Sequence, residues 1–241
     1  MPGELAAIYR REVTPILYLP VEEQMLYAGF LPDVRQDGII QSPQYILLVD
    51  RSAQVQAIFL FWLEPGETPM LIGASPVSTG RPGQFDHFET PAGTFEHTTD
   101  NPDFRAEGTR NALGIRGYGV KGMRVFDFGW QQAMRGWGRG GMSTMRLQMH
   151  ATDPAILEPR LGTRQSKGCI RIPASLNRLL DTFGVIDADY ANAESRGVHL
   201  AVPINQPSVY GPGKYLIVMD SQRSLRPAWA SPQVPPAKIG D

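Results

Sequence analysis

The sequence of 241 residues has a single cysteine, which excludes a disulfide bond within the chain and leaves the redox compartment undetermined. It also lacks an apolar run of the roughly 18 residues that a membrane-spanning helix needs. Residues 1–18 lack the apolar centre of a signal peptide. Basic and acidic residues nearly balance, and the formal charge of −1 argues against a nucleic-acid partner.

The chain does contain enough apolar residues, 42%, to fill one substantial core. We predict one catalytic domain over residues 44–220. An N-terminal helical extension over 1–43 precedes it, and a Pro-rich tail over 221–241 follows it.

The predicted secondary structure is mainly β. Apolar or alternating runs predict strands at 45–50, 54–63, 70–78, 123–128, 145–150, 199–204 and 215–219. Helices are predicted at 4–12, 21–30 and 175–183, the last ended by Gly184. The glycine-rich segment 129–142, with Trp130 and Trp137, suggests a mobile lid, although a plain surface loop would have the same composition.

The cysteine lies in the run Ser166-Lys167-Gly168-Cys169-Ile170-Arg171. A free cysteine is usually a buried apolar residue. Here, however, Gly168 leaves the backbone open beside the sulfur, and the amides of Gly168 and Cys169 are candidate donors to an oxyanion. Lys167 and Arg171 flank the thiol, and nearby cations lower a thiol pKa. The run therefore favours a nucleophile.

A candidate base precedes the cysteine. His150 ends a run in which Met145, Leu147 and Met149 alternate with polar residues. This period of two predicts a half-buried strand with His150 on its polar face. Alone, the histidine is as compatible with a structural role as with a catalytic one, but a thiol nucleophile needs such a base.

Together the two motifs resemble the L,D-transpeptidase (YkuD-type) family. Its signature is a histidine, a short spacer, Ser or Thr, His-Gly-Cys, a hydrophobic residue, and Asn or Arg; here the spacer is residues 151–165. Residues 76–80 and 90–95 resemble two upstream turns of that family, and Leu161-Gly162 resembles the glycine before the cysteine motif. Lys167 stands in place of the second histidine, which changes the wall of the substrate site but keeps the presumed nucleophile and base.

The resemblance implies a YkuD-type, β-sandwich-like catalytic domain with a short helix after the cysteine motif. It implies acyl transfer in which His150 accepts the Cys169 proton and an amine resolves the thioester. The substrate would be a peptidoglycan stem peptide, and the products 3,3 or 1,3 cross-links. By resemblance the Ala151 carbonyl orients His150.

The same resemblance implies that Arg171, Lys167 and Ser166 contact the substrate, with Arg171 and Lys167 receiving its carboxylates. It implies carbapenem-type inhibitors and no metal or organic cofactor. The expected location is the cell envelope or periplasm, with an export signal that this chain does not contain.

Other functions remain open at this stage. The alternatives are an L,D-carboxypeptidase, an enzyme that attaches proteins to the wall, and a non-catalytic wall-binding domain, although the retained Cys-His pair argues against the last. A metal-dependent hydrolase would use His87, Glu89, Glu96 and His97 with His150, but their spacing fits no compact zinc signature. A papain-like protease is a poor fit because its cysteine precedes its histidine.

Overall fold

The computed structural model describes residues 1–31, 42–202 and 209–231. Its strands form two sheets, and the predicted mainly β fold is confirmed. The first sheet has the strand order β3-β2-β1-β9-β4. The bounds of its strands are β1 Gln44–Asp50, β2 Ala57–Leu63, β3 Met70–Pro76, β4 Gly93–Glu96 and β9 Tyr215–Met219.

The centre of the first sheet is buried on both faces. Every residue of β1 and β2 is buried, as expected for strands that carry apolar side chains on both sides. β9 pairs in parallel with β1 and antiparallel with β4. A strand near the end of the chain therefore completes a sheet begun at residue 44.

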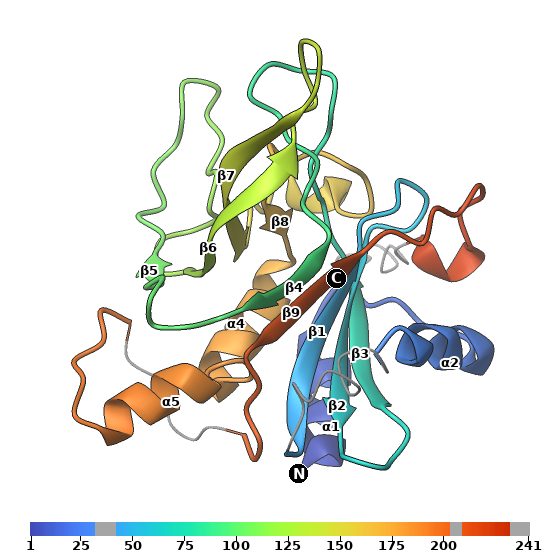
Figure 1. The fold of residues 1–241 in the computed structure, drawn as a ribbon, viewed down its shortest axis with the longest axis vertical. Helices are drawn as coiled ribbons and strands as arrows, with labels where there is room; N and C mark the ends of the chain where they lie inside the picture. Colours follow the sequence, from blue (N-terminus) through green and yellow to red (C-terminus); the bar gives the residue numbers. More distant parts are fainter. Residues whose placement is uncertain (32–41, 203–208, 232–241) are drawn as a thin grey trace, which may run out of the picture.

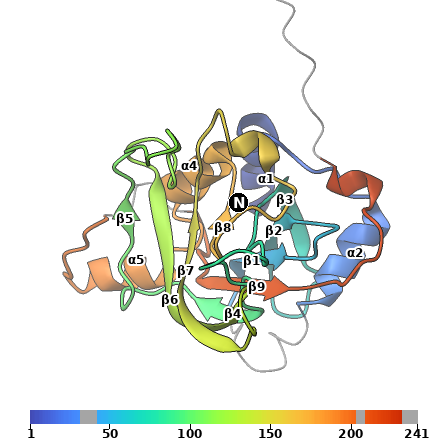
Figure 2. The same ribbon diagram turned by 90° about the horizontal axis from the view of Figure 1, so that it is seen from above.

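The second sheet carries the motifs singled out from the sequence. Its order is β5-β6-β7-β8, with bounds β5 Phe104–Arg105, β6 Arg124–Met134, β7 Met142–His150 and β8 Ile170–Arg171. β6 and β7 form a long antiparallel hairpin, and β8 pairs in parallel with the end of β7. Figure 1 shows this hairpin rising above the first sheet, and Figure 2 shows β8 beside β7 from above.

Four α-helices lie around the sheets in the described part of the chain: α1 Pro2–Glu12, α2 Val21–Gly29, α4 Ala174–Phe183 and α5 Ala188–Ser195. Two short 3₁₀ turns, η1 Glu158–Arg160 and η2 Ala228–Ala230, accompany them. The predicted helix after the cysteine is confirmed. It buries Leu176, Leu179 and Leu180 and ends at Gly184, whose left-handed φ of 57° suits glycine.

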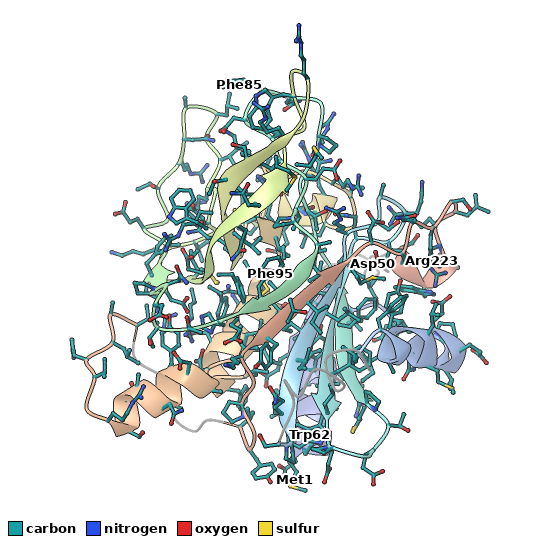
Figure 3. All side chains as sticks on the ribbon, viewed as in Figure 1. Met1, Asp50, Trp62, Phe85, Phe95 and Arg223 are labelled. Atoms are coloured by element: carbon teal, nitrogen blue, oxygen red, sulfur yellow. The ribbon has the colours of Figure 1, made fainter. Side chains whose placement is uncertain are left out.

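Two apolar clusters make up most of the core. The larger includes residues of α1, α4, β1, β6 and β7, and Cys169 packs against it. The smaller lies between the first sheet and α2 and is covered by Trp229 of the C-terminal segment. In Figure 3, Asp50 and Arg223 lie together on this side, where Tyr27 donates a hydrogen bond of 2.7 Å to Asp50.

Several predicted elements differ from the structure. The strand predicted at 54–63 begins only at Ala57, because residues 53–55 form a turn and Gln56 has a φ of 52°. No strand occurs at 199–202, and residues 203–204 of that predicted strand lie outside the described residues. The predicted tail is partly structured, since residues 228–230 form η2.

The segment 129–142 is not a free loop. The strand predicted at 123–128 continues to Met134, and only residues 135–141 form the turn of the hairpin. Strand β6 passes Gly129 through a β-bulge, where the Gly129 amide donates to Asp127 at 2.8 Å. The turn is tied to the segment before β4 by hydrogen bonds from Gly83 to the Gly136 carbonyl and from Gly136 to the His87 carbonyl. The mobility of this segment stays a prediction.

Candidate active site

The parallel pairing of β7 with β8 brings the two sequence motifs together. His150 is the last residue of β7 and lies opposite Arg171 of β8, two residues after Cys169. The Ile172 amide also donates to the His150 carbonyl at 2.9 Å. A base and a thiol that are nineteen positions apart in the sequence thus belong to adjacent strand ends.

The orientation of His150 is set by a backbone carbonyl. Its Nδ1 lies 2.5 Å from the Ala151 carbonyl oxygen, which is the contact that the family resemblance implies. When Nδ1 carries the proton and donates it to this carbonyl, Nε2 is left as an acceptor. His150 is buried, and Tyr118 stands edge-on against its ring with centroids 4.7 Å apart. The geometry gives the histidine one fixed tautomer.

The hydroxyl of Ser166 braces the turn that carries the thiol. Ser166 is 1% exposed; its Oγ donates to the Cys169 carbonyl at 2.5 Å and accepts from the Gly168 amide at 3.0 Å. Gly168 has a φ of +137°, and a Cβ added there would lie 2.7 Å from the Met145 sulfur. The positive φ favours glycine at position 168, whereas the flexible end of Met145 could move aside for a Cβ.

The engagement of Ser166 changes two expectations. The Gly168 amide already has an acceptor in the turn, so this amide is not free to bind an oxyanion. The Ser166 hydroxyl, expected to contact the substrate, has its hydrogen bonds inside the turn instead.

The thiol and the imidazole are both held in their neutral forms. Burial raises the pKa of the Cys169 thiol and outweighs a backbone hydrogen bond from Gln148 and the positive charge of Arg171, which act to lower it. Burial lowers the pKa of His150 to about 4, against the effect of the Ala151 hydrogen bond. The expectation that flanking cations make Cys169 a low-pKa thiol is wrong in its net direction, because desolvation is the larger effect.

The resting thiol points to a backbone carbonyl. The Cys169 Sγ lies 3.7 Å from the Arg146 carbonyl oxygen. Within the described ranges, no hydrogen bond joins Cys169 to His150. Proton transfer between them therefore requires the thiol to turn away from Arg146, in keeping with the long catalytic contacts common in free enzymes.

Arg171 and Lys167 occupy different environments. Arg171 is partly buried, its guanidinium donates to the Gln165 carbonyl at 3.0 Å, and its Nε has no hydrogen-bond partner in the described part of the chain. Burial lowers its pKa, and its charge acts on both Cys169 and His150. The Lys167 side chain is 64% exposed and forms an ion pair of 2.8 Å with Asp86 at the surface.

A polar cluster beside the thiol was not singled out from the sequence. Tyr118 donates to the Gln148 amide oxygen at 3.0 Å, Gln148 donates to Asp127 at 2.8 Å, and Arg146 also binds Asp127 at 3.0 Å. Burial raises the pKa of Tyr118, and the negative charge that Cys169 carries when ionised acts in the same direction. The signal was present in β7, because Arg146 and Gln148 share the polar face predicted for His150. Their partners Tyr118 and Asp127 had no such signal.

Two features extend the site over the surface. Trp130 is 64% exposed, and the guanidinium carbon of Arg146 lies over its ring, 5.6 Å from the ring centroid. A cavity of about 400 Å³ is lined by residues 104–109 and 117–119 and includes Tyr118. Tyr118 thus both lines this cavity and contacts the candidate base.

The residues of the alternative metal site lie in separate places. His97 is buried between the Ile186 carbonyl and Asp103, both at 2.9 Å. His87 contacts the Arg81 carbonyl, and Glu96 pairs with Lys214. Among the residues that the structure describes, no group of three or more His, Cys, Asp or Glu side chains is arranged to hold a metal ion. The geometry gives the hydrolase alternative no support.

Comparisons with known proteins bear on the family. Residues 44–187 match the family model of the YkuD L,D-transpeptidase catalytic domain, which is more than half of the 241 residues. A search of curated proteins gave no match. No helix among the described residues is both long and apolar enough to cross a membrane.

Two solved structures of the helical cell shape determining protein Pgp2 from Campylobacter jejuni are similar at 14% identity. The K307A mutant gives a TM-score of 0.35 and the other structure 0.34. The match covers 95% of this chain but only 58% of each Pgp2 chain, so the chain spans little more than half of that protein. These scores are too low to carry an argument, and the assignment rests on the family match. The chain belongs to the YkuD family of L,D-transpeptidase catalytic domains.

Proposed function

We propose that this protein is a cysteine acyltransferase that acts on peptidoglycan stem peptides through a thioester on Cys169. The proposal is supported by the pairing of adjacent strand ends, His150 with Arg171, beside the turn that holds the single thiol, and by the absence of a partner for the His150 Nε2 among the described residues. Membership of the YkuD family supports L,D-transpeptidase chemistry on peptidoglycan. The cell envelope or periplasm is the corresponding location.

The first half of the reaction forms the thioester. The Cys169 thiol turns from the Arg146 carbonyl, gives its proton to Nε2 of His150, and its sulfur attacks a stem-peptide carbonyl. The carbon–nitrogen bond then breaks, and the proton passes from His150 to the amine of the departing amino acid. Neutral imidazole is the form that accepts a proton, and a pKa of about 4 keeps His150 in that form at neutral pH.

The second half transfers the acyl group. An amine of a second strand attacks the thioester carbon, a new peptide bond forms, and the sulfur leaves and recovers a proton through His150. The product is a 3,3 or 1,3 cross-link, depending on which carbonyl is donated. Water in place of the amine would give an L,D-carboxypeptidase, and a protein amine would give attachment to the wall.

The oxyanion of each step needs a donor, and the Cys169 amide is the candidate. Its neighbour, the Gly168 amide, is bonded to Ser166. We assign Ser166 to holding the turn, and Arg171 to receiving a substrate carboxylate, because its guanidinium is partly buried and retains an unpaired Nε in the described structure. We assign Lys167, which lies at the protein surface, to the rim of the substrate site.

The catalytic unit in this proposal is residues 44–220. It is longer than the family match because β9 lies between β1 and β4 in the first sheet. Residues 1–43 act as a helical extension and 221–241 as a tail; in their described parts, α1 contacts β3 and Arg223 pairs with Glu23 of α2 at 2.5 Å.

Product analysis tests the proposal. Purified protein is incubated with muropeptides that carry tetrapeptide stems, and the products are identified by mass spectrometry. We expect dimers joined by a new peptide bond with loss of a terminal amino acid, and no dimers from Cys169→Ala. Binding without any new product would favour the wall-binding alternative, and shortened monomers alone would favour the carboxypeptidase.

A further inference from the structure

The hydroxyl of Thr90 is bonded to the peptide group between Gly168 and Cys169. Thr90 is 1% exposed and lies three residues before β4. Its Oγ1 donates to the Gly168 carbonyl at 2.7 Å and accepts from the Gly80 amide at 2.9 Å. The Thr90 carbonyl in turn accepts a hydrogen bond from Arg51. The Thr90 hydroxyl therefore both donates and accepts a hydrogen bond, and the bond from Arg51 holds the Thr90 backbone in place.

The bond to the Gly168 carbonyl fixes the direction of the Cys169 amide. The Gly168 carbonyl and the Cys169 amide belong to one trans peptide group, so their C=O and N–H bonds lie in one plane and point in opposite directions. While Thr90 holds the carbonyl on one side, the amide of Cys169 points to the other side. No acceptor for this amide occurs among the residues that the structure describes. The Cys169 amide, which belongs to the same residue as the sulfur, is therefore available as a donor.

The neighbouring peptide groups show why this bond matters. Ser166 holds the Gly168 amide on one side and the Cys169 carbonyl on the other. The peptide between them is held by Thr90, and glycine has no Cβ to restrict its rotation. Removing the hydroxyl would free this peptide plane to turn.

We propose that Thr90 is the positioning residue that directs the Cys169 N–H as the oxyanion donor. The inference rests on the proposed function, since an oxyanion forms only when Cys169 is acylated. Thr90 touches neither substrate nor sulfur in this scheme; it acts through the peptide group.

The test compares two reactions of the same thiol. Acylation by a carbapenem passes through a tetrahedral oxyanion, whereas alkylation by iodoacetamide does not. Thr90→Val keeps the shape of the side chain and removes the hydroxyl. We expect its acylation rate constant to fall by at least about tenfold, and by no more than the 10²- to 10³-fold that complete loss of one oxyanion donor costs. The alkylation rate should stay within about twofold, and Thr90→Ser should restore most of the acylation rate.

A matched control separates this effect from a general loss of stability. Ser75 is a buried hydroxyl bonded to Tyr9 at 2.7 Å, and Ser75→Ala removes a similar bond away from the thiol. We expect Ser75→Ala to lower the melting temperature while its acylation rate stays within about twofold of the unmodified protein. If Thr90→Val does not fold, Thr90→Ala is measured in the same way.

Three outcomes would overturn the inference. Thr90→Val acylated at the original rate would show that the bond does not direct the donor. Equal slowing of acylation and alkylation would indicate a disturbed thiol, and a Thr90→Ser variant as slow as Thr90→Val would exclude the hydroxyl. A protein whose original Cys169 is never acylated contradicts the proposed function itself, which distinguishes that failure from the other three.

Discussion

The pH dependence of Cys169 reactivity follows from the two pKa shifts at the site. The thiol pKa is raised by burial, and the pKa of His150 is lowered to about 4. At a pH between the lowered pKa of His150 and the raised pKa of Cys169, the dominant form is a neutral thiol beside a neutral imidazole. At pH 7 a histidine of pKa about 4 is protonated in roughly one molecule in a thousand. A preformed thiolate–imidazolium pair is therefore a minor species.

Alkylation by iodoacetamide measures the thiolate directly. Below the pKa of a thiol, the thiolate fraction rises tenfold for each pH unit. From pH 5.5 to pH 8.0 we expect the alkylation rate constant of Cys169 to rise about 300-fold, with a slope near one on a logarithmic plot. The chain has no other cysteine, so intact-mass measurement of the adduct reports this residue alone.

Substitution of His150 sharpens the test. In His150→Ala the alkylation profile should keep its slope and stay within a few-fold of the unmodified protein, because the imidazole is not the source of the thiolate. Acylation by a carbapenem should fall by about 10²- to 10⁴-fold, the usual contribution of a general base. A flat alkylation rate from pH 5 to 7 that disappears in His150→Ala would refute this reasoning, because it would show a stable ion pair.

Three further predictions concern the surroundings of the site. Lys167→Met should leave the alkylation profile of Cys169 unchanged, because the lysine pairs with Asp86 at the surface; a displaced profile in iodoacetamide kinetics would contradict this. Arg124→Met should lose about 3–5 kcal/mol in urea unfolding, because removal of the fully buried guanidinium takes from Asp103 and Asp187 the cation that bonds to both, whereas Arg105→Met, at a 34% exposed position, should lose about 1 kcal/mol or less. Because the pKa of His150 is lowered to about 4 in the folded protein, protonation favours the unfolded chain. The free energy of unfolding should therefore be unaffected by His150 above pH 6.5 and fall by about 3 kcal/mol as the pH is lowered to about 4. A fall of the same size in His150→Gln would exclude His150 as its source.

The sequence predicts the fold best where the local pattern and the burial agree. The sequence patterns at 54–63 and 175–183 predicted a strand and a helix, and both occur as β2 and α4. The long strand β6 was missed beyond Phe128 because Gly129 reads as a loop residue. In the structure that glycine sits in a bulge with a φ of 76°, and the strand continues past it.

The candidate site shows a similar division. The spacing of His150 and Cys169 was readable in the sequence, and strand pairing makes them neighbours. The electrostatics were not readable, because Lys167 is adjacent in sequence but directed to Asp86, while burial by distant segments sets the pKa of the thiol. Thr90 lies 79 positions before Cys169, and only the folded chain shows its bond to the Gly168 carbonyl.

The central claim is that Cys169 carries the acyl group, and trapping that intermediate tests it most directly. The protein is mixed with a tetrapeptide muropeptide without an acceptor amine, quenched in acid, digested and examined by mass spectrometry. We predict a tripeptide muropeptide attached through a thioester to the peptide that contains Cys169, released by hydroxylamine and missing in Cys169→Ala. An adduct on another residue, or cross-linked product formed by Cys169→Ala, would contradict the account.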